Sequence, residues 1–342
     1  MANQNVRTPR FYTDNINYLL SRGVAQDGNF DVRPSATNGA TTIGLQTGTE
    51  AECFDMNPLN KVDFDTSATT DGHVIINLDL KGSLKNSFVA ILNHNLSTAR
   101  GKIRISASDT ESEVQSPDFS GATAISCTEV VNADAISTNI ITPATDGSTI
   151  VRFSESDLRY WGIQFEGDST FLSTDLFFGC ILVGEYWDAA HAPDLSVQRS
   201  IMFDKTKVLE SVGGKRFSNM NNHGRTASSA SKSPFTTASN NYETYGGRIA
   251  YDMNFSYLAS TDLMPDEYDT LEYTDDAFVE DVWNKTNGSH IPFILSIDNS
   301  TTEEGGNAET QHIFARFAQN ELQMNQVAND FWNISLRIEE EF

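Results

Sequence analysis

The sequence predicts a mainly β protein made of two β-sandwich domains, the second of them β-rich with one or two helices. The chain of 342 residues is longer than one small domain usually is. Only 39% of its residues are hydrophobic, yet it contains 21 Phe, 10 Tyr and 4 Trp, which indicates packed β-structure and argues against global disorder. Short apolar runs separated by Gly, Ser, Thr and Asn recur along the chain, whereas helical periodicity is scarce.

The first 50 residues are expected to form an N-terminal segment or arm. Residues 11–23 contain an apolar stretch that predicts a strand or a short helix ending at Gly23. The Gly-, Thr- and Asn-rich residues that follow predict an extended arm or loop.

Residues 51–190 are predicted to form a jelly-roll β-sandwich. The clearest part is 87–109, where a buried strand and a polar turn precede a strand in which Ile103, Ile105 and Ala107 alternate with polar residues. About seven such segments, separated by turn residues, are typical of this architecture. The expected strands are 74–80, 88–92, 102–106, a weak pair within 124–131, 149–153, 160–165 and 176–183.

Residues 191–342 are predicted to form the second, β-rich domain. One helix or helical pair is expected over 263–287, because Leu271, Phe278, Val282 and Trp283 fall near helical spacing and Pro265 suits a helix start. The expected strands are 195–203, 207–211, 248–258, 291–297, 312–317 and 331–338.

A long polar segment, 211–247, interrupts the second domain and lies in a basic part of the chain. Residues 1–198 carry 12 basic and 25 acidic residues, 199–248 carry 8 and 3, and 249–342 carry 3 and 19. One interpretation is a solvated loop. The other is an arm that binds the acidic surface of a neighbouring copy, because opposite charges on one chain favour head-to-tail contacts. The residues expected at that subunit interface are Lys215, Arg216, Arg225 and Lys232.

No catalytic, cofactor-binding or metal-binding residues are predicted. The sequence contains no phosphate-binding loop, HExxH or GxSxG motif, and its six histidines do not cluster. Acidic pairs are numerous, but an acidic surface produces many such pairs by chance, and the regular calcium-loop spacing is absent. His94 and His191 are expected to stabilise turns by hydrogen bonding, and the four tryptophans are expected in cores.

Charge and cysteine content narrow the classes of partner. A formal net charge of −24 makes nucleic-acid binding unfavourable, because a DNA partner needs a cationic face. No run approaches the roughly 18 apolar residues of a membrane span, and residues 1–12 do not resemble a signal peptide. Three cysteines cannot all pair, so synthesis in a reducing cytoplasm is expected.

Several segments resemble tail proteins of tailed bacteriophages. LNHNL before the alternating strand, and RYWGIQF before an apolar return strand, are similar to the galactose-binding-like jelly rolls found in those proteins. The segment 184–218, with its HAPDL corner at 191–195, resembles their join to a second β-domain. The closing segment 314–342 resembles the end of tail-tip proteins.

The resemblance implies a structural, non-enzymatic component of the virion, in the tail tip or distal tail of the baseplate region. It implies a homo-oligomeric ring, hexameric or trimeric, that contacts other tail proteins. The first alternative is a lectin-like adhesion protein that binds host glycan through a jelly-roll loop with Asn93, Asn95 and Arg100. The second is a polysaccharide-degrading enzyme.

Overall fold

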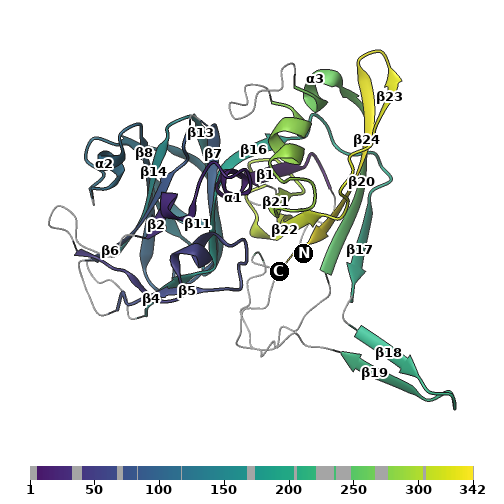
Figure 1. The fold of residues 1–342 in the computed structure, drawn as a ribbon, viewed down its shortest axis with the longest axis horizontal. Helices are drawn as coiled ribbons and strands as arrows, with labels where there is room; N and C mark the ends of the chain where they lie inside the picture. The colour runs from purple at the N-terminus through teal and green to yellow at the C-terminus, as the bar shows by residue number, and fades with distance from the viewer. Residues whose placement is uncertain are drawn as a thin grey trace.

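A computed structural model of the protein describes residues 6–32, 41–67, 72–82, 84–116, 118–167, 174–203, 206–220, 235, 248–265, 276–302 and 306–341. The fold is mainly β, as the sequence predicts, and its sheets are almost entirely antiparallel (Figure 1). The predicted strands are present with slightly different bounds, except that 176–183 is divided between two strands of different sheets, Leu176–Phe178 and Cys180–Asp188.

One 11-stranded sheet runs through both halves of the molecule in the order β10-β13-β7-β16-β1-β21-β22-β24-β20-β17, with β23 paired to β24 (Figure 1). Its strands are β1 (Arg10–Asp14), β7 (Asn86–His94), β10 (Cys127–Val131), β13 (Gly147–Ser156), β16 (Cys180–Asp188), β17 (Gln198–Met202), β20 (Arg248–Ala259), β21 (Phe293–Ser296), β22 (His312–Phe317), β23 (Met324–Ala328) and β24 (Phe331–Glu340).

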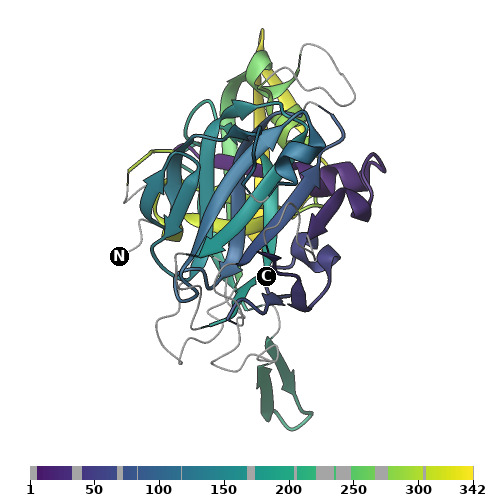
Figure 2. The ribbon, with the colours of Figure 1, turned by 90° about the vertical axis from the view of Figure 1, so that its left-hand side faces the viewer.

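A second sheet packs on the first half of this sheet and completes the predicted β-sandwich (Figure 2). Its strands are β2 (Phe30–Val32), β3 (Thr41–Thr42), β6 (Gly72–Asp79), β8 (Gly101–Ser108), β9 (Thr123–Ala124), β11 (Ala133–Ser137), β12 (Ile140–Pro143) and β14 (Tyr160–Gly167). A small sheet contains β4 (Leu45–Thr47), β5 (Val62–Phe64) and β15 (Leu176–Phe178).

The N-terminal strand β1 joins the two halves. It pairs with β16 on one side and with β21 on the other, and all five of its residues are buried. A Cβ atom at Gly184 of β16 would lie 1.9 Å from the carbonyl oxygen of Thr13, so this close approach requires glycine. The apolar segment near the N-terminus is therefore both a strand and a helix, since α1 (Asn15–Ser21) follows β1 directly.

The described parts of the first 50 residues belong to the body of the protein. Strands β2 and β3 pair with β6, and β4 pairs with β5. Asp14 caps α1 by accepting a hydrogen bond from the backbone N–H of Asn17 at 2.7 Å, and Gly23 with φ of 69° lies just beyond the helix.

The described residues of 263–287 contain one short helical segment, where one helix or a helical pair is predicted. Helix α3 (Ser260–Leu263) precedes it, and η3 (Val279–Asn284), a short π-helix, lies within it. Residues 266–275 lie outside the described part of the chain. Phe278 and Val282 reach the core as expected, but the described helix is a single short segment. The other short helices are η1 (Asp27–Asn29), η2 (Glu50–Phe54), α2 (Glu111–Val114) and η4 (Glu309–Gln311).

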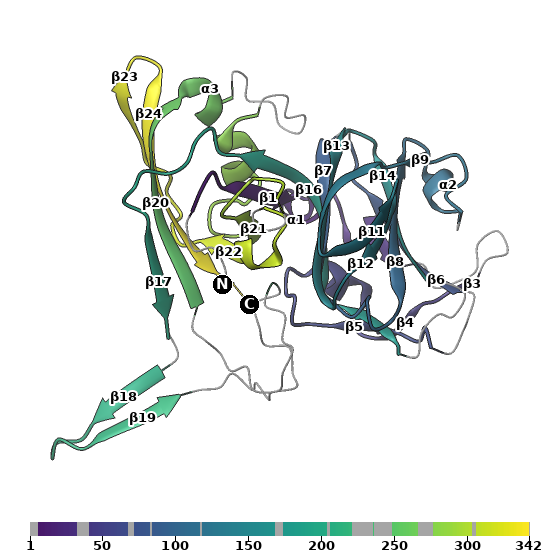
Figure 3. The same cartoon turned by 180° about the vertical axis from the view of Figure 1, so that it is seen from behind.

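The start of the long polar segment is a β-hairpin. Strand β18 (Thr206–Glu210) pairs with β19 (Arg216–Met220), and both extend away from the rest of the protein (Figures 1 and 3). Residues 216–220, within the predicted loop or arm, therefore form a strand. Of the remainder, only Phe235 is described, and its side chain is buried beside the His312 ring.

Buried side chains form three cores around the 11-stranded sheet. Along β16, Val183 lies in the core of the first sandwich and Trp187 in the core of the second half, with Glu185 between them on the same face. Tyr186 packs against the third core on the opposite face. The sheet is thus continuous, while a charged side chain divides the two apolar cores on one of its faces.

Candidate functional site

The division between the two cores contains a buried ion network. The Nζ atom of Lys285 donates a hydrogen bond of 2.7 Å to Glu185 Oε2 and lies 3.8 Å from Asp281 Oδ1. The three side chains are 1%, 3% and 3% exposed. Burial disfavours the charged lysine, but the two carboxylates outweigh it and raise the pKa of Lys285.

A second lysine lies closer to the surface and is shared by two carboxylates. Lys85 Nζ is 3.6 Å from Glu155 and 3.5 Å from Asp276. Carboxylate oxygens of Glu155, Glu185 and Asp276 lie within 4.8 Å of one another. Burial raises the pKa of Glu155, and repulsion from the other two acids adds to this, while Lys85 opposes it. Three carboxylates could ligate a cation, but an ammonium group already pairs with two of them.

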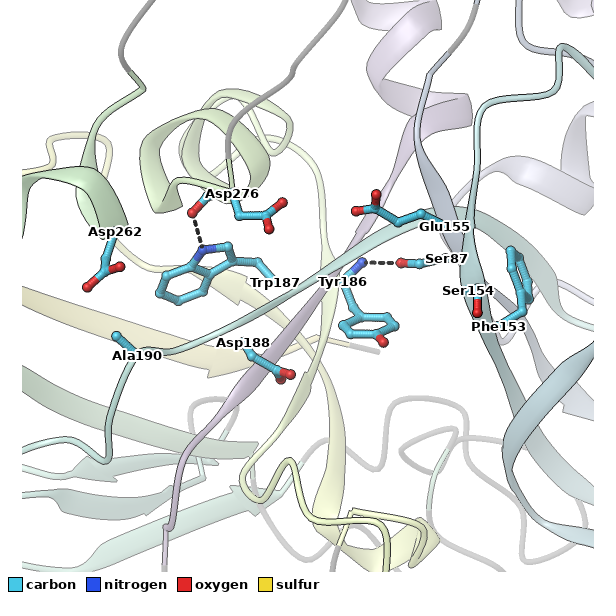
Figure 4. A pocket seen from close by; sticks show the side chains of 10 residues that line it. All are labelled: Ser87, Phe153, Ser154, Glu155, Tyr186, Trp187, Asp188, Ala190, Asp262 and Asp276. Atoms are coloured by element: carbon cyan, nitrogen blue, oxygen red, sulfur yellow. Dashed lines mark hydrogen bonds between the residues drawn. The ribbon is translucent and has the colours of Figure 1, made fainter.

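Two of these acids, Glu155 and Asp276, line a pocket of about 380 Å³ at the boundary between the two halves of the sheet (Figure 4). The pocket combines carboxylates with aromatic rings. The Trp187 indole donates a hydrogen bond to the Asp276 carbonyl, and Ser87 Oγ accepts one from the Tyr186 backbone (Figure 4). The lining residues are Ser87, Phe153, Ser154, Glu155, Tyr186, Trp187, Asp188, Ala190, Asp262 and Asp276.

One pocket acid is already neutralised. The Arg10 guanidinium donates two hydrogen bonds, of 2.7 and 2.8 Å, to the Asp188 carboxylate. The same guanidinium lies 4.1 Å from the centre of the Tyr186 ring. Glu155, Asp262 and Asp276 therefore supply the pocket's excess of negative charge, and Lys85 pairs with Glu155 and Asp276.

The β18–β19 hairpin is the second candidate functional feature. Of the eleven large hydrophobic side chains that are exposed in the described residues, seven fall between 195 and 217. On the hairpin, Leu209 is 67% exposed and its cross-strand partner Phe217 is 53% exposed. An apolar pair of this kind, on a segment that projects from the body, marks a contact surface.

The predicted interface residues fall partly on this hairpin. Lys215 is exposed, and its ammonium lies 5.2 Å from the centre of the Phe217 ring. Arg216 is exposed and pairs with Glu210 at 3.1 Å. Arg225 and Lys232 lie outside the described residues.

The predicted glycan-facing loop is held together by two of its own asparagines. Asn93 donates to the carbonyl of Pro58 at 2.7 Å, and Asn95 donates to Asp175 and accepts from the Phe177 backbone. Arg100 is exposed, with φ of 53°. The loop thus presents Arg100 to solvent, while the amides of Asn93 and Asn95 fix its shape.

His94 and His191 make hydrogen bonds at turns, as expected. The Nδ1 atom of His94 accepts from the Leu96 backbone, so Nε2 carries the proton and donates to Thr149 Oγ1 at 2.8 Å. Burial lowers the pKa of His94 to about 3. His191 Nδ1 bonds the carbonyl of Ala192.

The pocket could not be predicted from the sequence, because its residues come from separate segments. The strands containing Ser87, Glu155 and Trp187 are each visible as patterns, but their convergence depends on long-range pairing. Trp187, one of the four tryptophans predicted to lie in cores, is the one local signal for the site.

Comparisons with known proteins identify no family. No family model matches the sequence, and no curated protein matches it. One similar solved structure is the chitosan-binding module 1 derived from a chitosanase/glucanase of Paenibacillus sp. IK-5. It aligns with 46% of this chain and 96% of its own length, at 15% identity and a TM-score of 0.30. A likeness this distant carries no argument about function. In the described residues, no helix is long and apolar enough to cross a membrane.

Proposed function

We propose that this chain is a structural protein that assembles with copies of itself through the β18–β19 hairpin. The observation that carries the proposal is the exposed Leu209–Phe217 pair on a two-stranded element. An isolated two-stranded hairpin is marginally stable in water, so a contact that covers its apolar side chains would stabilise it.

The charge distribution supports a second copy as the partner. The hairpin strands and turn carry Lys207, Lys215 and Arg216 against Glu210, whereas the whole chain has a formal net charge of −24. A basic projection on an acidic molecule attracts other copies and steers their approach. The contact joins different surfaces of the two copies, and such contacts close into rings when the rotation permits.

The assembly is proposed to be part of a bacteriophage virion, as a tail-tip or distal-tail ring of six or three subunits. This step rests on the resemblance of the segments 88–107, 159–184 and 184–218 to tail proteins. In this role the protein contacts neighbouring tail proteins and performs no reaction.

The test is electron microscopy of the purified protein, followed by immunogold labelling of particles that contain it. Closed rings that dissociate in high salt, and label at the tail tip, support the proposal. A protein that stays monomeric at high concentration, or label confined to the head, would overturn it.

A second candidate function is binding of host glycan. The observation that favours it is the pocket near Trp187, where aromatic rings and carboxylates lie together as they do in many sugar sites. Binding to a glycan array that is lost in Asp262→Ala but kept in Asp134→Ala would support this function. Absence of binding across the array would remove it.

A further inference from the structure

We propose that the pocket lined by Glu155, Asp262 and Asp276 receives the tip of the β18–β19 hairpin from a second copy. This inference rests on the proposed function and names the surface to which the hairpin binds. The tip consists of residues 211–217, which are the turn after β18 and the first two residues of β19.

Charge supplies the first argument. Two pocket carboxylates, those of Glu155 and Asp276, share Lys85, and burial together with the neighbouring acids raises the pKa of Glu155. Their oxygens lie within 4.8 Å of one another and of Glu185, so a further cation would relieve the repulsion between them. Lys215 at the tip offers that cation, whereas Arg216 is paired with Glu210.

The apolar surfaces match as well. The partly exposed Tyr186 ring lies beside the pocket's acids, whereas Trp187 and Phe153 are only 7% and 2% exposed (Figure 4). The hairpin tip places Lys215 over the Phe217 ring, with the fully exposed Val212 in the turn. A tip that is apolar and basic would therefore find both aromatic and carboxylate groups in one pocket.

The occupant comes from another molecule. The hairpin stands away from the body of its own chain in views that differ by 90° (Figures 1 and 2). The contact therefore joins the hairpin of one copy to the pocket of the next, which is a head-to-tail arrangement.

Site-directed cross-linking tests this contact. Lys215→Cys protein is mixed with Asp276→Cys protein and treated with a short bismaleimide. The native thiols interfere little, since Cys53, Cys127 and Cys180 are buried and burial raises the pKa of Cys53 and Cys127 to about 12. The matched control is Lys215→Cys with Asp134→Cys, an exposed acid on β11 at a distance from the pocket.

The proposal predicts that the yield of cross-linked dimer with Asp276→Cys is at least ten times the yield with Asp134→Cys. Equal yields, or no dimer while the two Cys variants still associate with each other by light scattering, would show that the hairpin binds elsewhere. Wild-type protein that does not associate by light scattering would instead overturn the proposed function, so the two failures are distinguishable.

A charge exchange gives an independent readout. Lys215→Glu should weaken association, and Asp276→Lys in the same chain should restore it, because every pocket then meets a hairpin of opposite charge. Asp134→Lys should give no rescue. If Asp134→Lys restored association as well as Asp276→Lys does, the effect would be one of net charge. That result would overturn the inference.

Discussion

Lys285 on the segment after η3 donates a hydrogen bond of 2.7 Å to Glu185 on β16, and neither side chain is more than 3% exposed. This bond joins the second half of the protein to the strand that runs into the first. A buried ion pair adds little net stability over apolar residues of similar volume, but loss of one partner leaves a buried charge. The pair therefore fixes how η3 packs on the sheet.

Glu185→Gln is expected to lower the free energy of unfolding by about 3 to 5 kcal/mol, because Lys285 loses its nearest carboxylate and keeps the more distant Asp281. Chemical denaturation monitored by circular dichroism measures this. The control is Arg216→Gln, which removes an exposed ion pair with Glu210 and should cost about 0 to 1 kcal/mol. Equal losses in the two variants would contradict a structural role for the buried pair.

The raised pKa of Glu309 predicts that the stability of the protein depends on pH. Burial raises its pKa from 4.5 to about 7, opposed by a hydrogen bond from the Ser148 backbone. Because the pKa of Glu309 is higher in the folded protein than in the unfolded chain, this group stabilises the fold fully below about pH 4.5. That stabilisation is lost as the pH rises to about 7. Asp14, with a pKa raised to about 6, acts in the same direction.

Glu309→Gln keeps an acceptor for Ser148 and removes the titration. It is expected to be more stable than wild type at pH 8 by about 1 to 3 kcal/mol, and equal to it at pH 4. Thermal unfolding at both pH values measures the difference. Glu321→Gln, on an exposed residue, is the control, and an identical gain there would show that the effect is one of net charge.

Ile103 and Ile105 on β8 are fully buried in the core of the first sandwich, which agrees with the alternation in the sequence. Ile103→Asp should unfold that sandwich, because an unpaired carboxylate in an apolar core costs several kcal/mol. Lys102→Asn, one residue earlier on the other face, should leave the circular dichroism spectrum and melting temperature near wild type. A folded Ile103→Asp variant would refute the strand register.

The strands were predictable because each is a local pattern. In β8, apolar Ile103 and Ile105 alternate with Lys102 and Arg104, and the pattern needs no knowledge of the partner strand. The position of β1 was not predictable, since its pairing with both β16 and β21 joins residues far apart in sequence.

The sequence contains a local signal for the hairpin. Gly213 and Gly214, the latter with φ of 78°, lie between two segments with apolar residues, and such a pair is a common hairpin turn. The polar composition after residue 217 obscured it. The helix expected near 263–287 is present in part as η3, where Phe278 and Val282, four residues apart, both reach the core.

The molar mass of the protein in solution, measured by light scattering across a concentration series, tests the central claim most directly. Wild type should form a defined oligomer, and Leu209→Ser combined with Phe217→Ser should remain a folded monomer, whereas Ile136→Ser on β11 should assemble normally. A wild-type monomer at every concentration, or an oligomer that the hairpin variant forms equally well, would contradict assembly through β18–β19.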